Sequence, residues 1–281
     1  MRSRSTSPWR RGSFSTRCCV GAERAVFLVG AAVLGLCFGS FLNVCILRLA
    51  KEDKKDRSLF HPPSSCPHCH RRIAWRDNIP VISWLLLHGK CRWCGHPIST
   101  QYPVVEAVVG VLWLAAMLAY GPTLHFVAAA VLGTILLGIA VTDARHYLIP
   151  DEYNWVGLGL GLALSLGEGV DGFLQAVLGA AGGFGVLFAV GLLGRWILKE
   201  EAMGGGDIKM MAMVGSFVGW KGALLTVFAA AVFGSLVYVP LLLLKKKRLV
   251  PFGVFLAMGA ALTFVAGDTI LDWYRRFLGG G

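Results

Sequence analysis

The chain has 281 residues, of which 56% are hydrophobic and only 15% are charged. This excess of apolar residues excludes an ordinary soluble protein and indicates a polytopic membrane protein. The formal net charge of +11 does not indicate nucleic-acid binding, because the basic residues cluster between apolar runs.

The N-terminal 23 residues are basic and rich in serine, with no apolar period. We interpret residues 1–23 as a disordered tail that precedes a first transmembrane helix at 24–49. A cleaved signal peptide does not fit, because the apolar stretch that follows is too long and has no small-residue cleavage pattern.

Apolar segments recur along the rest of the chain and predict an all-α fold with about eight transmembrane helices. A helix needs roughly 20 residues to span a bilayer, so two of the segments, 154–167 and 207–219, are short. Glycine-rich runs within the segments permit the close helix packing found in lipid. The eight segments are 24–49, 104–120, 123–142, 154–167, 172–198, 207–219, 221–244 and 252–274.

The distribution of charge predicts how the helices are oriented. The loop 51–102 contains nine Lys and Arg residues against four Asp and Glu residues, so it should be cytoplasmic. Counting spans from this loop places the junctions 143–153 and 199–206 on the same side, and the basic cluster 245–248 agrees. The arginines before the first span and after the last one run against the rule.

The same loop carries two pairs of cysteines, Cys66 with Cys69 and Cys91 with Cys94, separated by 21 residues. Four thiolates in two C-x-x-C pairs are typical of a structural zinc site. Disulfides are not expected in a loop assigned to the reducing cytoplasm. We therefore predict a small zinc domain over 50–103, held together by the metal.

Between the cysteine pairs, residues 73–85 form an amphipathic and aromatic stretch. This stretch could lie at the membrane interface, where tryptophan is favoured. It could instead form the hydrophobic core of the zinc unit, an interpretation that we weigh slightly higher at this point.

A tight glycine run, Gly204-Gly205-Gly206, places Asp207 at the start of the apolar segment that follows. Residues without Cβ let the backbone approach another segment closely. A carboxylate at a helix N-terminus is stabilised by the free N–H groups there, but near a membrane it is costly without a partner or a wet cavity. Asp207 is therefore a functional candidate, with Lys209 as a neighbouring support.

The matching carboxylate is Asp143, which ends the third apolar run. The topology count puts both aspartates at one depth on one side. Two close carboxylates share a proton, so one can act as base on water while the other polarises a carbonyl, as in aspartic peptide hydrolysis. Two alternatives remain open: a proton-coupled transporter that uses the same aspartates, or structural ion pairs of Asp143 with Arg145 and Asp207 with Lys209.

These elements together resemble the type IV prepilin peptidase family over nearly the whole chain from about residue 24. The Gly-x-Gly-Asp element alone is also shared with presenilin-like intramembrane proteases. The remaining matches are Gly39-Ser40-Phe41-Leu42-Asn43-Val44, Asp77-Asn78-Ile79-Pro80, Ser83-Trp84-Leu85, Tyr102-Pro103-Val104-Val105-Glu106, Ile149-Pro150-Asp151 and Pro251-Phe252-Gly253.

The resemblance implies an aspartic endopeptidase of the bacterial inner membrane that cuts the basic leader from prepilins or pseudopilins on the cytoplasmic side. It implies Asp143 and Asp207 as the catalytic pair, the four loop cysteines as Zn²⁺ ligands, and 104–281 as the peptidase core. Members with this loop also N-methylate the new amino terminus with S-adenosylmethionine, for which the sequence shows no nucleotide fingerprint. Val254 stands where the family more often has a second proline.

Overall fold

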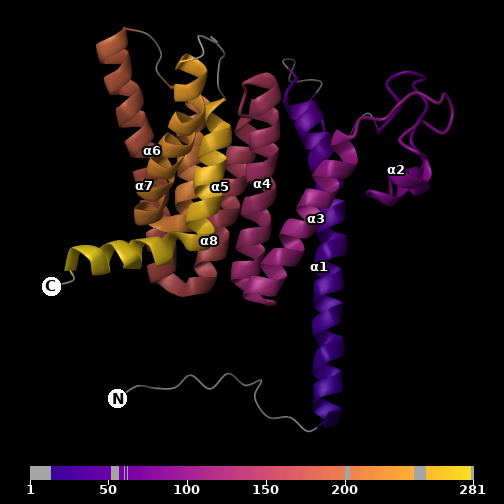
Figure 1. Cartoon of the computed structure of the whole chain (residues 1–281), viewed down its shortest axis with the longest axis horizontal. Helices are drawn as coiled ribbons and strands as arrows, with labels where there is room; N and C mark the ends of the chain where they lie inside the picture. Colours follow the sequence, from indigo (N-terminus) through magenta and orange to yellow (C-terminus); the bar gives the residue numbers. More distant parts are fainter. Residues whose placement is uncertain are drawn as a thin grey trace.

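The computed structural model describes residues 14–51, 57–59, 61, 63–199, 203–243 and 251–279. Over these residues the chain is a bundle of long α-helices with a small loop unit at its side (Figure 1). The helices are α1 (Phe14–Leu49), α2 (Ile82–Leu86), α3 (Gln101–Tyr120), α4 (Leu124–His146), α5 (Asp151–Ser165), α6 (Gly169–Leu198), α7 (Gly205–Leu243) and α8 (Phe252–Gly279).

The all-α prediction is confirmed, and six helical stretches are long and apolar enough to cross a membrane by length and composition. α1 begins at Phe14, so part of the expected tail belongs to this helix. Residues 1–13 and the basic cluster 245–248 lie outside the described residues.

Helix α7 is two helical arms joined at Gly219, which has non-helical backbone angles of φ 68° and ψ 177°. Gly219 lines one cavity with Tyr120 and Glu168, at the α3–α4 and α5–α6 connections. Gly253, the second residue of α8, lies against Asp143 at the other end of α4. The arms therefore run out and back, and they correspond to the expected segments 207–219 and 221–244.

Counting the arms of α7 separately gives eight long helices among the described residues, besides the short α2. That all eight span the membrane remains a prediction. We call the end of the bundle that carries Asp143 and Asp207 the aspartate end, and the opposite end the Gly219 end.

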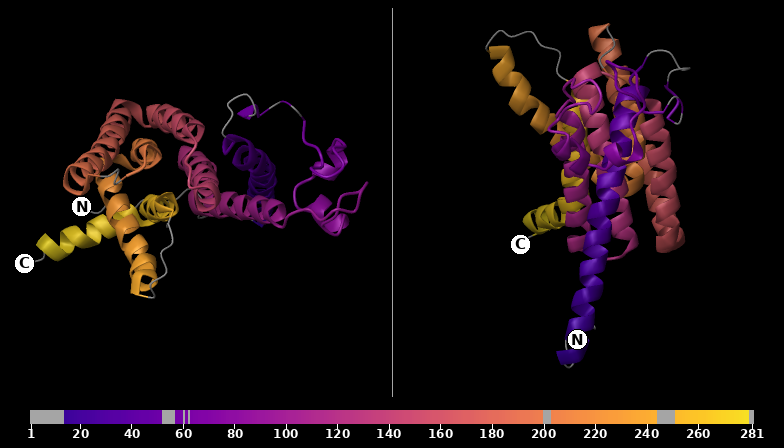
Figure 2. Two further views of the ribbon diagram at one scale, coloured as in Figure 1. Left: turned by 90° about the horizontal axis from the view of Figure 1, so that it is seen from above. Right: turned by 90° about the vertical axis from the view of Figure 1, so that its right-hand side faces the viewer.

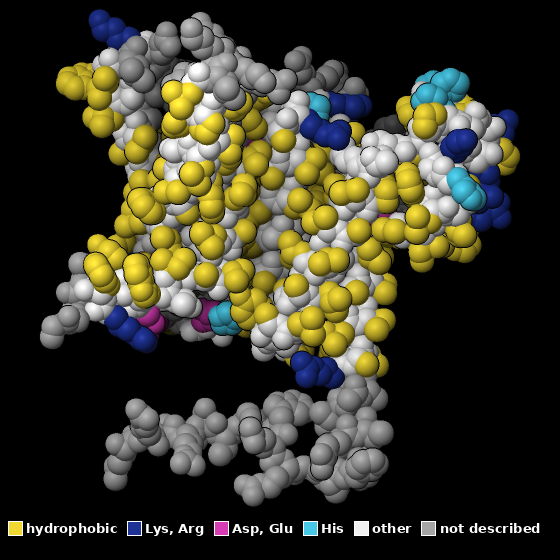
Figure 3. Space-filling model, in the orientation of Figure 1, with side chains coloured by type: hydrophobic (Ala, Val, Ile, Leu, Met, Phe, Trp, Pro, Cys, Tyr) yellow, Lys and Arg dark blue, Asp and Glu magenta, His cyan; other side chains and the backbone are white. Residues whose placement is uncertain are grey.

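Close backbone approaches hold the helices together, as the glycine-rich sequence predicts. A Cβ on Gly215 in α7 would overlap the backbone of Gly179 in α6, so neither position has room for a side chain. The bundle core is apolar and includes Leu132, Met210 and Leu256, all fully buried. Side chains on the outside of the bundle are also mainly apolar, which suits a lipid-facing surface (Figure 3).

The loop unit between α1 and α3 stands beside these two helices, away from α5 to α8 (Figures 1 and 2). Two isolated antiparallel bridges, Ser65 with Arg72 and Lys90 with Pro97, each fold one cysteine pair into a tight turn. An ion pair of 3.4 Å between Arg57 and Glu152 links the start of this unit to the first turn of α5. The loop unit thus lies at the aspartate end.

Candidate active site and zinc loop

Asp143 lies in the last turn of α4 and is only 6% exposed. The helix ends at Tyr147, which adopts the left-handed conformation with φ 53° and caps the carbonyl of Asp143. Ile149 precedes a proline and is therefore kept out of the helical region, so α5 begins only at Asp151. The turn leaves the Asp143 side chain facing the interior of the bundle end.

The N-terminus of α8 closes over Asp143. The backbone N–H groups of Gly253 and Val254 face its carboxylate. A Cβ on Gly253 would stand 2.8 Å from Asp143 Oδ2 and 2.8 Å from Ile149 Cδ1, so any larger residue there would displace these two side chains. Helix N-termini stabilise negative charge, and this one is aimed at a carboxylate.

Asp207 occupies the first turn of α7, and its N–H donates to the carbonyl of Gly204 at 3.2 Å. The glycine run packs on the turn that follows Asp143, because a Cβ on Gly206 would lie 2.9 Å from Ile149 Cβ. The Asn154 side chain donates to the Gly206 carbonyl at 3.4 Å and fixes the run from α5. The sequence thereby brings the two aspartates together, and their carboxylates interact electrostatically.

Each aspartate keeps one buried carboxylate oxygen, Oδ2 of Asp143 and Oδ1 of Asp207, without a hydrogen-bond partner in the described part of the chain. Buried polar atoms are normally paired, and a catalytic role is one of the recognised reasons for an exception. The arrangement can bind a polar group between two carboxylates and exchange a proton with it.

Lys209 forms its ion pair with Asp151 of α5, at 2.7 Å, and not with Asp207. Arg145 is exposed at the end of α4. Neither of the two ion pairs considered from the sequence, Asp143 with Arg145 or Asp207 with Lys209, occurs among the ion pairs of the described residues. These structural roles for the aspartates are therefore not supported.

The four loop cysteines converge, with the Sγ atoms of Cys66, Cys69, Cys91 and Cys94 all within 4.8 Å of one another. The N–H groups of Cys69 and His68 lower the pKa of Cys66 to about 6, which favours the thiolate that binds metal. Four thiolates at this spacing fit a tetrahedral Zn²⁺ ion. No histidine of the described residues joins the cluster; His68 instead stacks on His96, with the ring centroids 4.7 Å apart.

Between the cysteine pairs, Asp77 and Arg92 form a two-pronged ion pair. The Arg92 Nε atom lies 2.9 Å from one carboxylate oxygen of Asp77, and its Nη2 atom contacts the other. This hydrogen bonding holds the pKa of Asp77 below its usual range. The pair ties the short helical turn at Trp75–Asn78 to the second cysteine pair.

Glu106 and Asn43 belong to motifs noted in the sequence, but sequence reasoning gave them no role. Glu106 is buried in α3 and accepts a hydrogen bond of 2.7 Å from the N–H of Val81 in the loop unit. Asn43 of α1 is 1% exposed and donates to the Tyr102 carbonyl at 3.1 Å. The signal that could have found Glu106 is an acid inside an apolar span, where it must have a partner.

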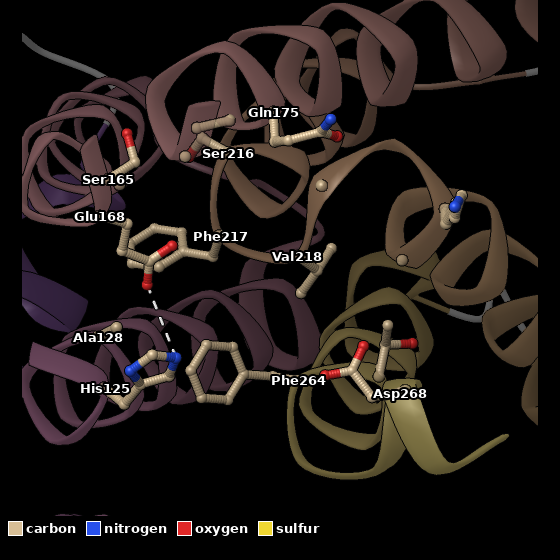
Figure 4. Close-up of a pocket in the computed structure, with 18 of the residues that line it drawn as sticks. His125, Ala128, Ser165, Glu168, Gln175, Ser216, Phe217, Val218, Phe264 and Asp268 are labelled. Atoms are coloured by element: carbon tan, nitrogen blue, oxygen red, sulfur yellow. Dashed lines mark ion pairs between the residues drawn. The ribbon is translucent and has the colours of Figure 1, made fainter. Parts of the chain in front are cut away.

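A cavity of about 770 Å³ opens at the Gly219 end. Figure 4 shows His125 paired with Glu168 on one side of it and Asp268 of α8 on the other. It is lined from the α3–α4 and α5–α6 connections, so it lies at the far end of the bundle from Asp143 and Asp207.

The fold and site define a multi-pass membrane protein with paired aspartates at one end and a four-cysteine loop beside them. Comparison with known sequences gives the family. The model of the bacterial peptidase A24 N-terminal domain matches residues 33–120, and that of the type IV leader peptidase family matches residues 130–239. The chain belongs to the type IV leader peptidase family.

Several relatives carry the name prepilin leader peptidase/N-methyltransferase. One from Myxococcus xanthus is 39% identical over 218 residues, a match that covers 78% of this chain and 64% of the relative's length. Relatives from Dickeya chrysanthemi and Xanthomonas campestris are 34% and 35% identical over 85% and 89% of this chain, and 93% and 94% of their own lengths are covered. These names give no support to the transporter alternative. No solved structure gave a significant match.

Proposed function

We propose that this protein is an aspartic endopeptidase that removes the basic leader from type IV prepilins or pseudopilins, with Asp143 and Asp207 as its catalytic pair. The observation that carries the proposal is the meeting of these two carboxylates, each with one buried oxygen that has no partner in the described chain. The names of the relatives support the substrate class.

In this mechanism one aspartate is ionised and the other protonated. The ionised carboxylate takes a proton from a water molecule, whose oxygen attacks the scissile carbonyl carbon. The protonated aspartate donates a hydrogen bond to the carbonyl oxygen, which gains negative charge. As the C–N bond breaks, the acquired proton passes to the leaving amine.

The site suits a substrate that is itself a membrane helix. A prepilin carries a short basic leader before an apolar segment, so it can enter laterally and present the scissile bond at the aspartate end. We assign this end to the cytoplasm of a bacterial inner-membrane protein, because the basic loop 51–102 belongs to it.

We assign the zinc domain to 50–103 and the peptidase core to 104–281, after a tail (1–23) and the first helix (24–49). Cys66, Cys69, Cys91 and Cys94 would hold Zn²⁺ as a structural ion that keeps the loop folded. The glycine run 204–206 would set the position of Asp207.

We further propose that the protein methylates the new amino terminus. S-adenosylmethionine would supply the methyl group to the freed α-amino nitrogen, with S-adenosylhomocysteine as the by-product and a proton released from the amine. The support is the second half of the relatives' printed names, and we assign the methyl donor no residues.

Both activities are tested by co-expression with a candidate prepilin from the same genome. Sequencing the amino terminus of the product should show the leader removed, and labelled S-adenosylmethionine should transfer its methyl group to the processed pilin. An unprocessed product with every prepilin of the genome would contradict the peptidase proposal. Processing without methyl transfer would leave a peptidase alone.

A further inference from the structure

The loop unit exposes a set of large apolar side chains that nothing in the described structure covers. Trp75 is 84% exposed and Leu86 is 73% exposed. Ile79, Ile82 and Leu85 are exposed with them, and we call these five residues the apolar face of the zinc loop. The interpretation of this stretch as the core of the zinc unit is therefore wrong for these five side chains.

The opposite side of α2 is the one that packs on the loop. Ser83 is buried and its hydroxyl donates to the carbonyl of Arg76 at 2.9 Å. The Trp84 indole donates to the carbonyl of Ile98 at 3.2 Å. The loop's polar contacts thus use one side of α2 and leave Ile82, Leu85 and Leu86 outward.

The position of α2 along α3 sets its depth. Val81, the residue before α2, bonds through its N–H to Glu106, which lies in the second turn of α3. Because a helix rises 1.5 Å per residue, this attachment lies about 7 to 8 Å below the start of α3. Figure 1 shows α2 at the height of the first turns of α3, below the top of α1.

The apolar face therefore stands at the level where α3 already exposes an apolar surface, including Val104, Val108 and Val111. Figure 3 shows apolar side chains gathered at the lower edge of the loop unit, the edge that is turned toward the Gly219 end of the bundle. The apolar face and these valines of α3 are thus exposed at the same level of the bundle.

The charges around this face suit a lipid surface. Residues 63–100 contain five basic side chains and one acidic side chain, Asp77, which forms an ion pair with Arg92. Arg71, Arg72, Arg76 and Lys90 remain exposed. Exposed tryptophan and leucine with flanking arginine and lysine are typical of segments that lie in the interface of an anionic membrane.

We propose that the zinc loop is inserted in the membrane: its apolar face lies in the leaflet at the aspartate end, and its basic residues bind anionic lipid headgroups. The loop then has two anchors, the bilayer and Glu106 of α3. This assignment does not depend on the proposed peptidase activity.

The test places a photo-crosslinking amino acid, p-benzoylphenylalanine, at Leu86 or, as the matched control, at Ser64, an exposed polar position outside both the apolar face and the basic residues. The full-length protein is reconstituted with zinc in vesicles of phosphatidylethanolamine and phosphatidylglycerol, with a prepilin added to half of the samples. We expect several-fold more lipid adducts at position 86 than at position 64, by mass spectrometry. Equal lipid adducts at both positions, or adducts at 86 to prepilin or to a second copy in place of lipid, would overturn the proposal.

A second measurement uses Trp75 and needs no crosslinker. Lipids brominated on the upper part of the acyl chain should quench more fluorescence in the unaltered protein than in the Trp75→Phe variant, because the removed indole lies among the chains. If the variant is quenched by the same amount as the unaltered protein, Trp75 is outside the bilayer and the proposal fails. Zinc content confirms that the loop is folded in every variant.

Discussion

Two regions of the molecule bring distant residues together, the aspartate end of the bundle and the zinc loop, and they do so by different forces. At the aspartate end, Gly206 of α7 and Gly253 of α8 pack directly on the side chains of Asp143 and Ile149, with no room for a Cβ unless those side chains shift. In the loop, four thiolates within 4.8 Å and one arginine–aspartate pair join short turns that have little core of their own.

The two regions are therefore sensitive to different substitutions. A site held by close packing is disturbed by one added methyl group, because the interior cannot expand freely. A site held by a metal tolerates changes in its exposed side chains and fails when one ligand is lost.

The largest effect is expected from Asp143→Asn and Asp207→Asn. Neither amide can take a proton from water, so leader removal should fall by roughly a thousandfold or more. The amides keep the size of the side chain, so insertion and zinc content should not change. The measurement is the rate of leader removal from purified prepilin in vesicles. Asp268→Asn, at the Gly219 end, is the control; wild-type rates in either active-site variant would refute the catalytic pair.

Cys91→Ser should remove the metal, from about one zinc per chain to almost none, because three thiolates and a hydroxyl bind Zn²⁺ far more weakly. Leader removal should fall less than in the aspartate variants, since the residues around the aspartates come from α4, α5, α7 and α8. Elemental analysis and the processing rate measure the two effects. Cys37→Ser, on the exposed side of α1, should keep its zinc; full zinc in Cys91→Ser would refute the site.

Gly253→Ala tests the packing of the aspartate end. The new methyl carbon would stand 2.8 Å from Asp143 Oδ2, well inside contact distance, so the carboxylate must shift. A displacement of this kind should slow leader removal by about 10- to 100-fold without loss of zinc. Gly159→Ala is the matched control, because its methyl group would meet nothing within 4 Å. Equal rates in the two variants would mean that Asp143 has room to move without cost.

Glu106→Ala tests the junction between the two regions. The substitution removes the hydrogen-bond acceptor of the Val81 N–H. Val81 itself has a backbone φ of 61°, a conformation that non-glycine residues hold only when the surroundings enforce it. Losing a hydrogen bond to a charged group should cost about 1.5 to 3 kcal/mol of loop docking. Hydrogen exchange of the amides of 79–87 should quicken accordingly. Glu152→Ala, which breaks a half-exposed pair with Arg57, should cost less than about 1 kcal/mol.

Much of this arrangement was readable from the sequence, for identifiable reasons. The cysteine spacing predicts the cluster because metal geometry limits ligand distances, and span counting places Asp143 and Asp207 at one end because helix length fixes where each chain segment returns. The break at Gly219 was also visible as a gap between two apolar segments.

The contacts that finish the site were not readable. The N–H groups of Gly253 and Val254 face Asp143 as backbone atoms, and backbone donors leave no mark in a sequence. The partner of Glu106 is the N–H of Val81, and the position of this loop residue beside α3 follows from the tertiary packing of the loop unit. Sequence proximity suggested Lys209 as a neighbour of Asp207, whereas the helix directs it to Asp151 of another element.

The smallest effect is expected from Lys209→Met. The Lys209–Asp151 pair is short, at 2.7 Å, but its side chains are 39% and 49% exposed, so it should contribute less than about 1 kcal/mol. Leader removal should then change less than about fivefold, and Asp151→Asn should have the same effect. Because both variants break the same ion pair, the double variant should be no slower than either single variant. If Lys209 instead served Asp207, Lys209→Met alone would slow the reaction strongly and Asp151→Asn would not, which would move this lysine from the helix surface into the catalytic site.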